Sequence, residues 1–202
     1  MIEVEKKFIL TEKEEKSLTT GAEFLGEKTF IDIYYDDENY SLTGKDIWLR
    51  KRSDRFELKI PLNLNIKERI SDQYREIEND EDILKYFNTN INEPLESFLI
   101  NNKYFPFCEI KTTRRKYKKN GFNIDLDSMD FGYKLAEIEY MISSEAEMEQ
   151  ATKSILEFAK SCNIDTKAIV KGKVIEYLRL NDPKHFQTLI DLEVVKEDKL
   201  SL

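Results

Sequence analysis

Charged and apolar side chains alternate along the first two thirds of the chain. It opens with "MIEVEKKF", in which Glu3, Glu5 and Lys7 take every second position and the apolar Ile2, Val4 and Phe8 lie on the opposite parity. Successive side chains of an extended strand point to opposite faces, so this segment predicts a strand with one charged and one apolar face. The same spacing recurs at Arg50 and Arg52, Glu57 and Lys59, Glu76 and Glu78, Asp125 and Asp127, and Glu137 and Glu139.

Segments rich in β-branched and aromatic residues predict further strands, bounded by turn residues. Ser53-Asp54 separates "DIWLRKR" from "RFELKIP", which predicts a hairpin, and Asn120-Gly121 is the strongest short hairpin signal in the chain. The predicted strands cover residues 2–8, 28–37, 46–52, 55–61, 73–78, 105–119, 122–131 and 133–142.

Helical signals lie at the ends of this β region. Thr11 with Glu14 forms a capping box, and Ser144 with Glu147 forms a second one ahead of apolar residues at helical intervals. Further helices are expected within 80–102, around 167–180 and, after Pro183, around 184–193. We expect residues 1–202 to form one domain, with a charged and loose tail after Leu192, and the stretch 61–72 to carry no site residue.

The recurring charged faces decide the predicted architecture. A sheet with one solvated face explains any single strand of this kind, but repetition with both signs of charge favours a sheet closed on itself. We therefore predict an α+β fold: a closed eight-stranded antiparallel β-barrel with charges inside and helices packed outside and at one end. Buried charges need partners, and a metal-bound polyphosphate satisfies acids and bases together.

Composition narrows the partners and the compartment. The 202 residues are 40% hydrophobic and 36% charged with a net charge of −8, which argues against nucleic-acid binding. Cys108 and Cys162 lack metal-site spacing and are expected to be free thiols. Neither a signal pattern nor an apolar run of the ~20 residues that span a bilayer is present, so a cytoplasmic protein without membrane contact is expected.

The order of these motifs resembles the CYTH family, also called triphosphate tunnel metalloenzymes. The similar segments are "IEVEKKF", "TFIDIYYD", "WLRKRSDRFELK", "TTR", "IDLDSMDFGY" with "EIE", and "KGKVIEYL". The opening motif alone is weak evidence, whereas the ordered set along the chain is strong. The likeness is closest to the members that hydrolyse thiamine triphosphate, and it implies a phosphoanhydride hydrolase with Mg²⁺, or Mn²⁺ in its place. We expect the protein to be a monomer.

The resemblance also implies roles for individual residues. Glu76, Lys59 and Lys173 are the expected catalytic residues, with Glu76 near the metal. Asp127 shares a face with Asp125 and is expected next to the metal ligands without binding the metal itself. Strand parity alone leaves Arg114 and Arg115 equally good candidates for the arginine that contacts phosphate, and the resemblance favours Arg114. Phosphate contacts are expected from Lys7, Arg50, Arg52, Lys59, Arg114 and Lys173, and metal contacts from Glu3, Glu5, Asp125, Glu137 and Glu139.

Trp48 bears on the choice of substrate. It is the only tryptophan and shares the face of Arg50 and Arg52, so its ring is expected near the mouth of the tunnel, where it could stack on the thiazolium cation. A core aromatic is the commoner fate of a lone tryptophan. The alternatives are an inorganic tripolyphosphatase, a cyclase making cyclic AMP and a non-catalytic polyphosphate-binding module. The lone His185 is expected in a surface-like helix, without a catalytic role.

Overall fold

A computed structural model of the protein describes residues 2–62 and 72–195. Its strands are β1 (Ile2–Phe8), β2 (Glu23–Asp36), β3 (Trp48–Arg52), β4 (Arg55–Pro61), β5 (Asp72–Ile77), β6 (Phe105–Lys119), β7 (Phe122–Met129) and β8 (Lys134–Ile142). Its α-helices are α1 (Glu12–Thr19), α2 (Asp80–Tyr86), α3 (Leu95–Asn101), α4 (Met148–Ser161), α5 (Lys173–Asn181) and α6 (Pro183–Asp191), and two 3₁₀ turns are η1 (Thr43–Lys45) and η2 (Glu145–Glu147).

The strands form a closed antiparallel barrel in the order β1-β5-β4-β3-β2-β6-β7-β8, and β8 pairs back onto β1. This confirms the predicted fold class. The contacts of the chain group into two compact units, of residues 1–30, 70–74 and 111–176, and of residues 31–69, 75–110 and 177–202. We describe each unit by itself.

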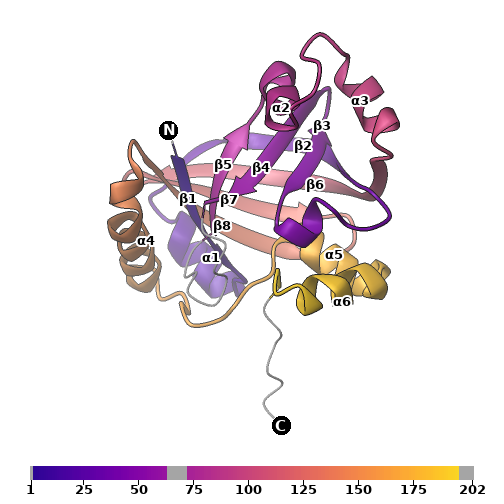
Figure 1. Ribbon diagram of the computed structural model, residues 1–202. Helices are drawn as coiled ribbons and strands as arrows, with labels where there is room; N and C mark the ends of the chain where they lie inside the picture. The colour runs from indigo at the N-terminus through magenta and orange to yellow at the C-terminus, as the bar shows by residue number, and fades with distance from the viewer. Residues whose placement is uncertain (1, 63–71, 196–202) are drawn as a thin grey trace. The chain divides into compact units, whose positions relative to one another are not determined.

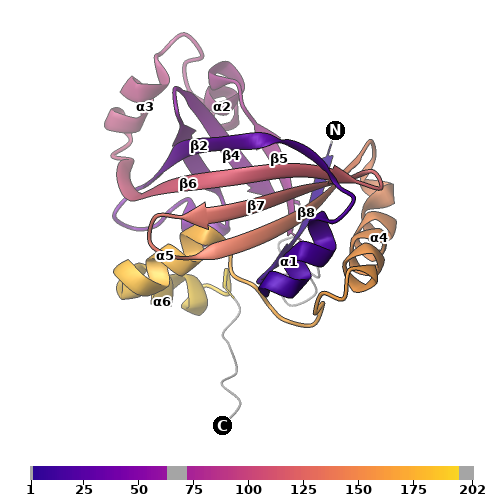
Figure 2. The same cartoon turned by 180° about the vertical axis from the view of Figure 1, so that it is seen from behind.

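In the first unit, the apolar faces of β1, β7 and β8 pack against helices. Ile124 and Ile138 are fully buried with Leu18 of α1 and Ile155 of α4 in one core cluster, and Figure 2 shows α1 and α4 beside β8. The opposite faces of the same strands are also buried, although they carry charges: Asp125 is 0% exposed. Because helices cover the apolar side from outside, the charged side is the inner side of the barrel.

The second unit repeats this arrangement. Leu49, Phe56 and Leu58 on one face of the β3–β4 hairpin are buried together with Ile83 of α2 and Phe98 of α3, and Figure 1 shows α2 at this hairpin. The hairpin turns at Ser53, which takes the left-handed conformation with φ +55°. The opposite face again carries buried charges, including Arg50 and Glu57.

Several local predictions meet the structure directly. Thr11 caps α1 in the predicted capping box, and Asn120-Gly121 joins β6 to β7 with both residues at positive φ. Cys108 and Cys162 are buried free thiols, as expected. No described helix has the length and apolar character to cross a bilayer.

Two helix predictions need correction. The Ser144 hydroxyl accepts a hydrogen bond from the Ala146 amide and caps η2, so α4 begins at Met148 without a capping box. Residues 167–172 are not helical, and α5 starts only at Lys173; β-branched residues and Gly172 disfavour helix in that segment. Residues 63–71 and 196–202 lie outside the described residues, and with them most of the stretch 61–72 and of the expected loose tail. Within that tail, Val195 is described and buried.

Candidate metal and phosphate site

Five carboxylates of the first unit gather on the inner faces of three adjacent strands. The pairing of β1 with β8 sets Glu5 opposite Glu139, and the pairing of β7 with β8 sets Asp125 opposite Glu137. Carboxylate oxygens lie within 4.8 Å of one another in two groups that share Glu139. The groups contain all of the predicted metal ligands, namely Glu3, Glu5 and Glu139 in one, and Asp125, Glu137 and Glu139 in the other.

This crowding shifts the protonation of the acidic cluster. Burial, followed by the charges of Glu3 and Asp125, raises the pKa of Glu139 to about 9. Burial also raises the pKa of Asp125, against the lowering effect of Arg114. Among the described residues, no donor reaches the buried Oδ1 atom of Asp125. Clustered carboxylate oxygens are the ligands that a hard divalent cation binds, so the cluster fits a metal such as Mg²⁺.

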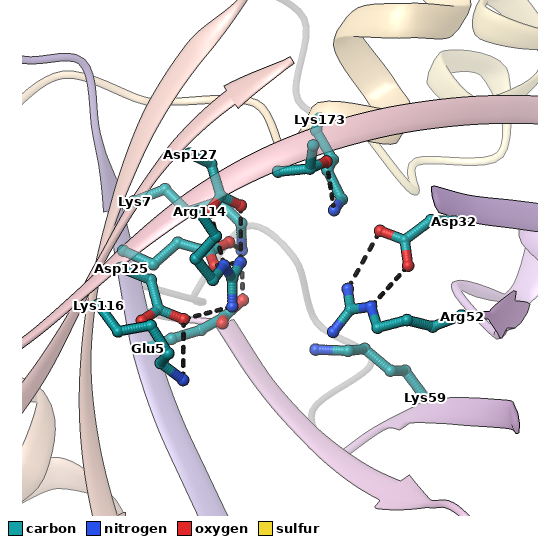
Figure 3. Close-up of polar contacts among 12 residues, drawn as sticks. Glu5, Lys7, Asp32, Arg52, Lys59, Arg114, Lys116, Asp125, Asp127 and Lys173 are labelled. Atoms are coloured by element: carbon teal, nitrogen blue, oxygen red, sulfur yellow. Dashed lines mark hydrogen bonds and ion pairs between the residues drawn. The ribbon is translucent and has the colours of Figure 1, made fainter. Parts of the chain in front are cut away.

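Arg114 is the central cation of the first unit (Figure 3). Its Nε and Nη2 atoms donate to the two oxygens of Asp127 at 2.6 Å each, Nη2 donates to Glu137 Oε2 at 2.8 Å, and Nη1 donates to Asp125. The neighbouring Arg115 points to the other face and donates to Glu15 of α1 at 2.9 Å. The choice between the two arginines that parity left open therefore falls on Arg114.

Two lysines complete the cations of this unit that the sequence predicted. Lys7 on β1 donates to Glu5. Lys173 stands at the first position of α5, where the residue is 8% exposed. Its Nζ lies 3.3 Å from Thr112 Oγ1 and 5.0 Å from the ring centroid of Phe30. From sequence alone Lys173 resembles a surface lysine, and the structure instead buries it.

The second unit holds a separate network of ion pairs. Arg52 donates through Nε to Asp32 Oδ1 at 2.7 Å and through Nη2 to Asp32 Oδ2 at 3.1 Å, as Figure 3 shows. Arg50 Nε donates to Glu57 Oε2 at 2.8 Å. Burial would raise the pKa of Glu57, but the charges of Arg50 and Arg52 outweigh it and lower that pKa.

Lys59 and Glu76, both predicted to be catalytic, form an ion pair in this second unit. Burial would raise the pKa of Glu76, but the charge of Lys59 outweighs it and lowers that pKa. The two residues come from β4 and β5, which are neighbours in the barrel. The structure thus pairs Glu76 with Lys59, and its expected place near the metal stays a prediction.

Residues 1–172 match the family described as "CYTH domain". The chain belongs to the CYTH family. The thiamine-triphosphatase of Macaca fascicularis is 26% identical over 217 residues, covering 98% of this chain and 93% of that protein, and that of Homo sapiens is 25% identical with the same coverage. Among solved structures, the PH1819 protein of Pyrococcus horikoshii OT3 has a TM-score of 0.61 at 20% identity, covering 88% of this chain and 98% of that one. At this identity the structural likeness shows the fold alone.

In this CYTH protein, Trp48 lies on the charged face of β3 and is 6% exposed. Its indole Nε1 donates to Asp46 Oδ1 at 2.8 Å. Tyr34 stands edge-on to the indole, with ring centroids 6.4 Å apart and planes at 89°. Burial raises the pKa of Tyr34 to about 12. The position of the Trp48 ring near a mouth of the tunnel stays a prediction.

The expectation for His185 is wrong in part. The residue is 0% exposed, its Nε2 lies 2.8 Å from Thr43 Oγ1, and its ring stacks on Tyr40 with centroids 3.9 Å apart. Helix α6 therefore turns His185 inward, because the polar tip finds a hydroxyl partner and the ring finds an aromatic neighbour. The structure gives it no contact with the charged clusters that it describes.

Sequence reasoning missed several partners of the predicted residues. Asp32 shares the parity of Phe30 and Tyr34, and a charge inside an otherwise aromatic strand was the available signal. Glu57 was recognised as part of the charged face without a role, and it turns out to pair with Arg50. Thr112, which contacts Lys173, lies in the family-like segment "TTR" but was given no role, since a buried threonine in a strand is ordinary.

Proposed function

We propose that this protein is a metal-dependent thiamine triphosphatase, which hydrolyses thiamine triphosphate to thiamine diphosphate and phosphate. The observation that carries the proposal is the acidic cluster around Glu139 beside the buried Arg114. Membership of the CYTH family and the similarity to the macaque and human thiamine-triphosphatases support it.

The acidic cluster would hold one or two Mg²⁺ ions, or Mn²⁺ in their place, through Glu3, Glu5, Asp125, Glu137 and Glu139. When bound, the metal would neutralise phosphate charge and lower the pKa of a coordinated water. Asp127 accepts from Nε and Nη2 along one edge of the Arg114 guanidinium and thereby fixes the orientation of this cation.

We assign phosphate binding to Lys7, Arg50, Arg52, Lys59, Arg114 and Lys173. These side chains already sit against carboxylates or hydroxyls, so they are positioned before substrate arrives. Preorganised cations are effective because phosphoryl transfer depends on positioning and charge stabilisation, without a protein nucleophile. Glu76 is assigned to orient the attacking water or to hold Lys59 in place.

Residues 1–202 are proposed to act as one domain and as a monomer. The strands β2, β5 and β6 each contribute residues to both compact units, so neither unit owns a complete sheet. The expected partner of the protein is the small-molecule triphosphate.

The substrate is assigned through Trp48. A permanent cation such as the thiazolium ring gains roughly 0.5–2 kcal/mol from stacking on an indole, and neither tripolyphosphate nor ATP carries one. The test is phosphate release from thiamine triphosphate, tripolyphosphate and ATP with Mg²⁺, comparing wild type and Trp48→Ala. The preference for thiamine triphosphate should fall in Trp48→Ala, and an unchanged preference would refute the substrate assignment.

The enzymatic assignment has its own test. Glu137→Gln should abolish release from every triphosphate while binding of tripolyphosphate is retained, because the cations remain. Glu145→Gln, at an exposed glutamate of η2, is the matched control and should keep full activity. Binding without turnover in the wild type would identify a polyphosphate-binding module, and release of pyrophosphate with cyclic AMP from ATP would identify a cyclase.

A further inference from the structure

The segment between β2 and β3 is built around one buried carboxylate. Asp36 Oδ1 accepts from the amides of Asp37 at 2.8 Å and Leu42 at 3.0 Å. Its Oδ2 accepts from the Thr43 amide at 2.8 Å and from the Thr43 hydroxyl at 2.6 Å. A carboxylate that accepts several donors of one loop fixes the course of that loop.

Helix α6 holds the same loop from a distant part of the sequence. Because the Thr43 hydroxyl donates its proton to Asp36, its lone pair can accept from His185 Nε2–H, and the two atoms lie 2.8 Å apart. The His185 ring also stacks on Tyr40 of the loop. The backbone that follows is therefore held in one place.

The loop delivers Asp46 to the side of the tryptophan. Asp46 takes the left-handed conformation, φ +61°, with its amide donating to Thr43 O at 2.9 Å. Its Oδ1 accepts the Trp48 indole proton at 2.8 Å, and the Asp46 and Trp48 residues are each 6% exposed. A neutral acceptor would satisfy the indole equally well, whereas burying a carboxylate carries a larger desolvation cost.

We propose that Asp46 determines specificity for the organic end of the substrate. Its carboxylate orients the Trp48 indole and places a negative charge beside the ring on which an organic cation would stack. An anion accepting the indole proton also increases the electron density of the ring, which strengthens its attraction for a cation. The inference rests on the proposed function and deepens it: the substrate class is a phosphate ester that carries a permanent positive charge.

The test uses Trp48 as its own reporter, since it is the only tryptophan of the chain. Fluorescence titrations in EDTA compare thiamine diphosphate with inorganic pyrophosphate, which has the phosphates without the cation. Asp46→Asn keeps an oxygen acceptor and tolerance of the left-handed backbone while it removes the charge. Asp54→Asn, in the exposed β3–β4 turn, is the matched control.

Asp46→Asn should weaken thiamine diphosphate binding about tenfold and pyrophosphate binding less than about twofold, and Asp54→Asn should bind both ligands like the wild type. Equal weakening of both ligands, or no weakening, would overturn the inference. If Asp46→Asn does not fold, Asp46→Ser takes its place, because its hydroxyl also accepts the indole proton. The same fold-changes in thiamine diphosphate and pyrophosphate binding are then expected.

A separate measurement isolates the proposed function. Release of phosphate from thiamine triphosphate by the wild type with Mg²⁺ tests hydrolysis without reference to Asp46. Absence of hydrolysis together with selective loss of thiamine diphosphate binding in Asp46→Asn refutes the proposed enzyme and supports the inference. Hydrolysis in the wild type with an unaltered ratio of the two affinities in Asp46→Asn refutes the inference alone.

Discussion

Replacing Glu139 by glutamine should stabilise the metal-free protein, which is the reverse of the usual effect of altering a buried site. The residue Glu139 is 6% exposed and belongs to both groups of carboxylates in the acidic cluster. Burial and the surrounding acids raise its pKa from 4.5 to about 9. The folded protein therefore binds a proton on Glu139 over a pH range in which the unfolded chain releases it.

The sign and size of the effect follow from linkage. With more protons bound in the folded state, the free energy of unfolding falls as pH rises from about 4.5 to about 9. At pH 7.5 the loss amounts to up to about 4 kcal/mol, at about 1.36 kcal/mol for each pH unit above 4.5. Glutamine avoids this loss and can donate to the neighbouring carboxylates. For a chain of this length the gain corresponds to roughly 8–16 °C in melting temperature.

Thermal denaturation in EDTA at pH 5 and at pH 7.5 measures the effect, which should be large only at the higher pH. Glu57→Gln is the matched control, because it alters a buried glutamate that is paired with Arg50. It should destabilise by about 3–5 kcal/mol, since it weakens the compensation of a buried guanidinium. Mg²⁺ should then raise the melting temperature of the wild type more than that of Glu139→Gln. A Glu139→Gln variant no more stable than the wild type at pH 7.5 would refute the reasoning about the acidic cluster.

Two further predictions concern other parts of the fold. Arg114→Ala should cost about 3–5 kcal/mol of stability in a urea titration, because it removes the guanidinium that pairs with the buried Asp125 and Asp127. Arg115→Ala, which loses a half-exposed pair with Glu15 and an interaction with Tyr117, should cost under about 1 kcal/mol. Equal costs of the two substitutions would contradict the assigned faces. Burial lowers the pKa of His185 below 6.5, although the charges of Asp182 and Asp36 act to raise it. As pH falls, the unfolded chain therefore takes up the proton first. The free energy of unfolding should fall by up to about 1.4 kcal/mol per pH unit below pH 6.5. His185→Gln should lack this loss, and identical pH profiles for the two proteins in that range would show that His185 does not titrate on unfolding.

The local rules of the chain determined much of this fold. Strand alternation placed Glu3 and Glu5 on one face, and Asn120-Gly121 set the β6–β7 hairpin, because side-chain parity and turn conformation depend on adjacent residues only. The predicted metal ligands came together for the same reason: each lay on the charged face of its strand. Closing the sheet then left one inner side on which these faces could meet.

Tertiary structure decided what adjacent residues cannot encode. Parity states that Arg114 and Arg115 face opposite ways, but only the packing of α1 shows which of them turns inward. Register pairs Glu5 with Glu139, which lies far away in the sequence, and burial in that acidic neighbourhood raises the pKa of Glu139. The burial of Lys173 and the inward turn of His185 depend on Thr112 and Thr43, both far away in sequence. Burial and protonation are properties of the three-dimensional environment, and a single strand or helix does not specify them.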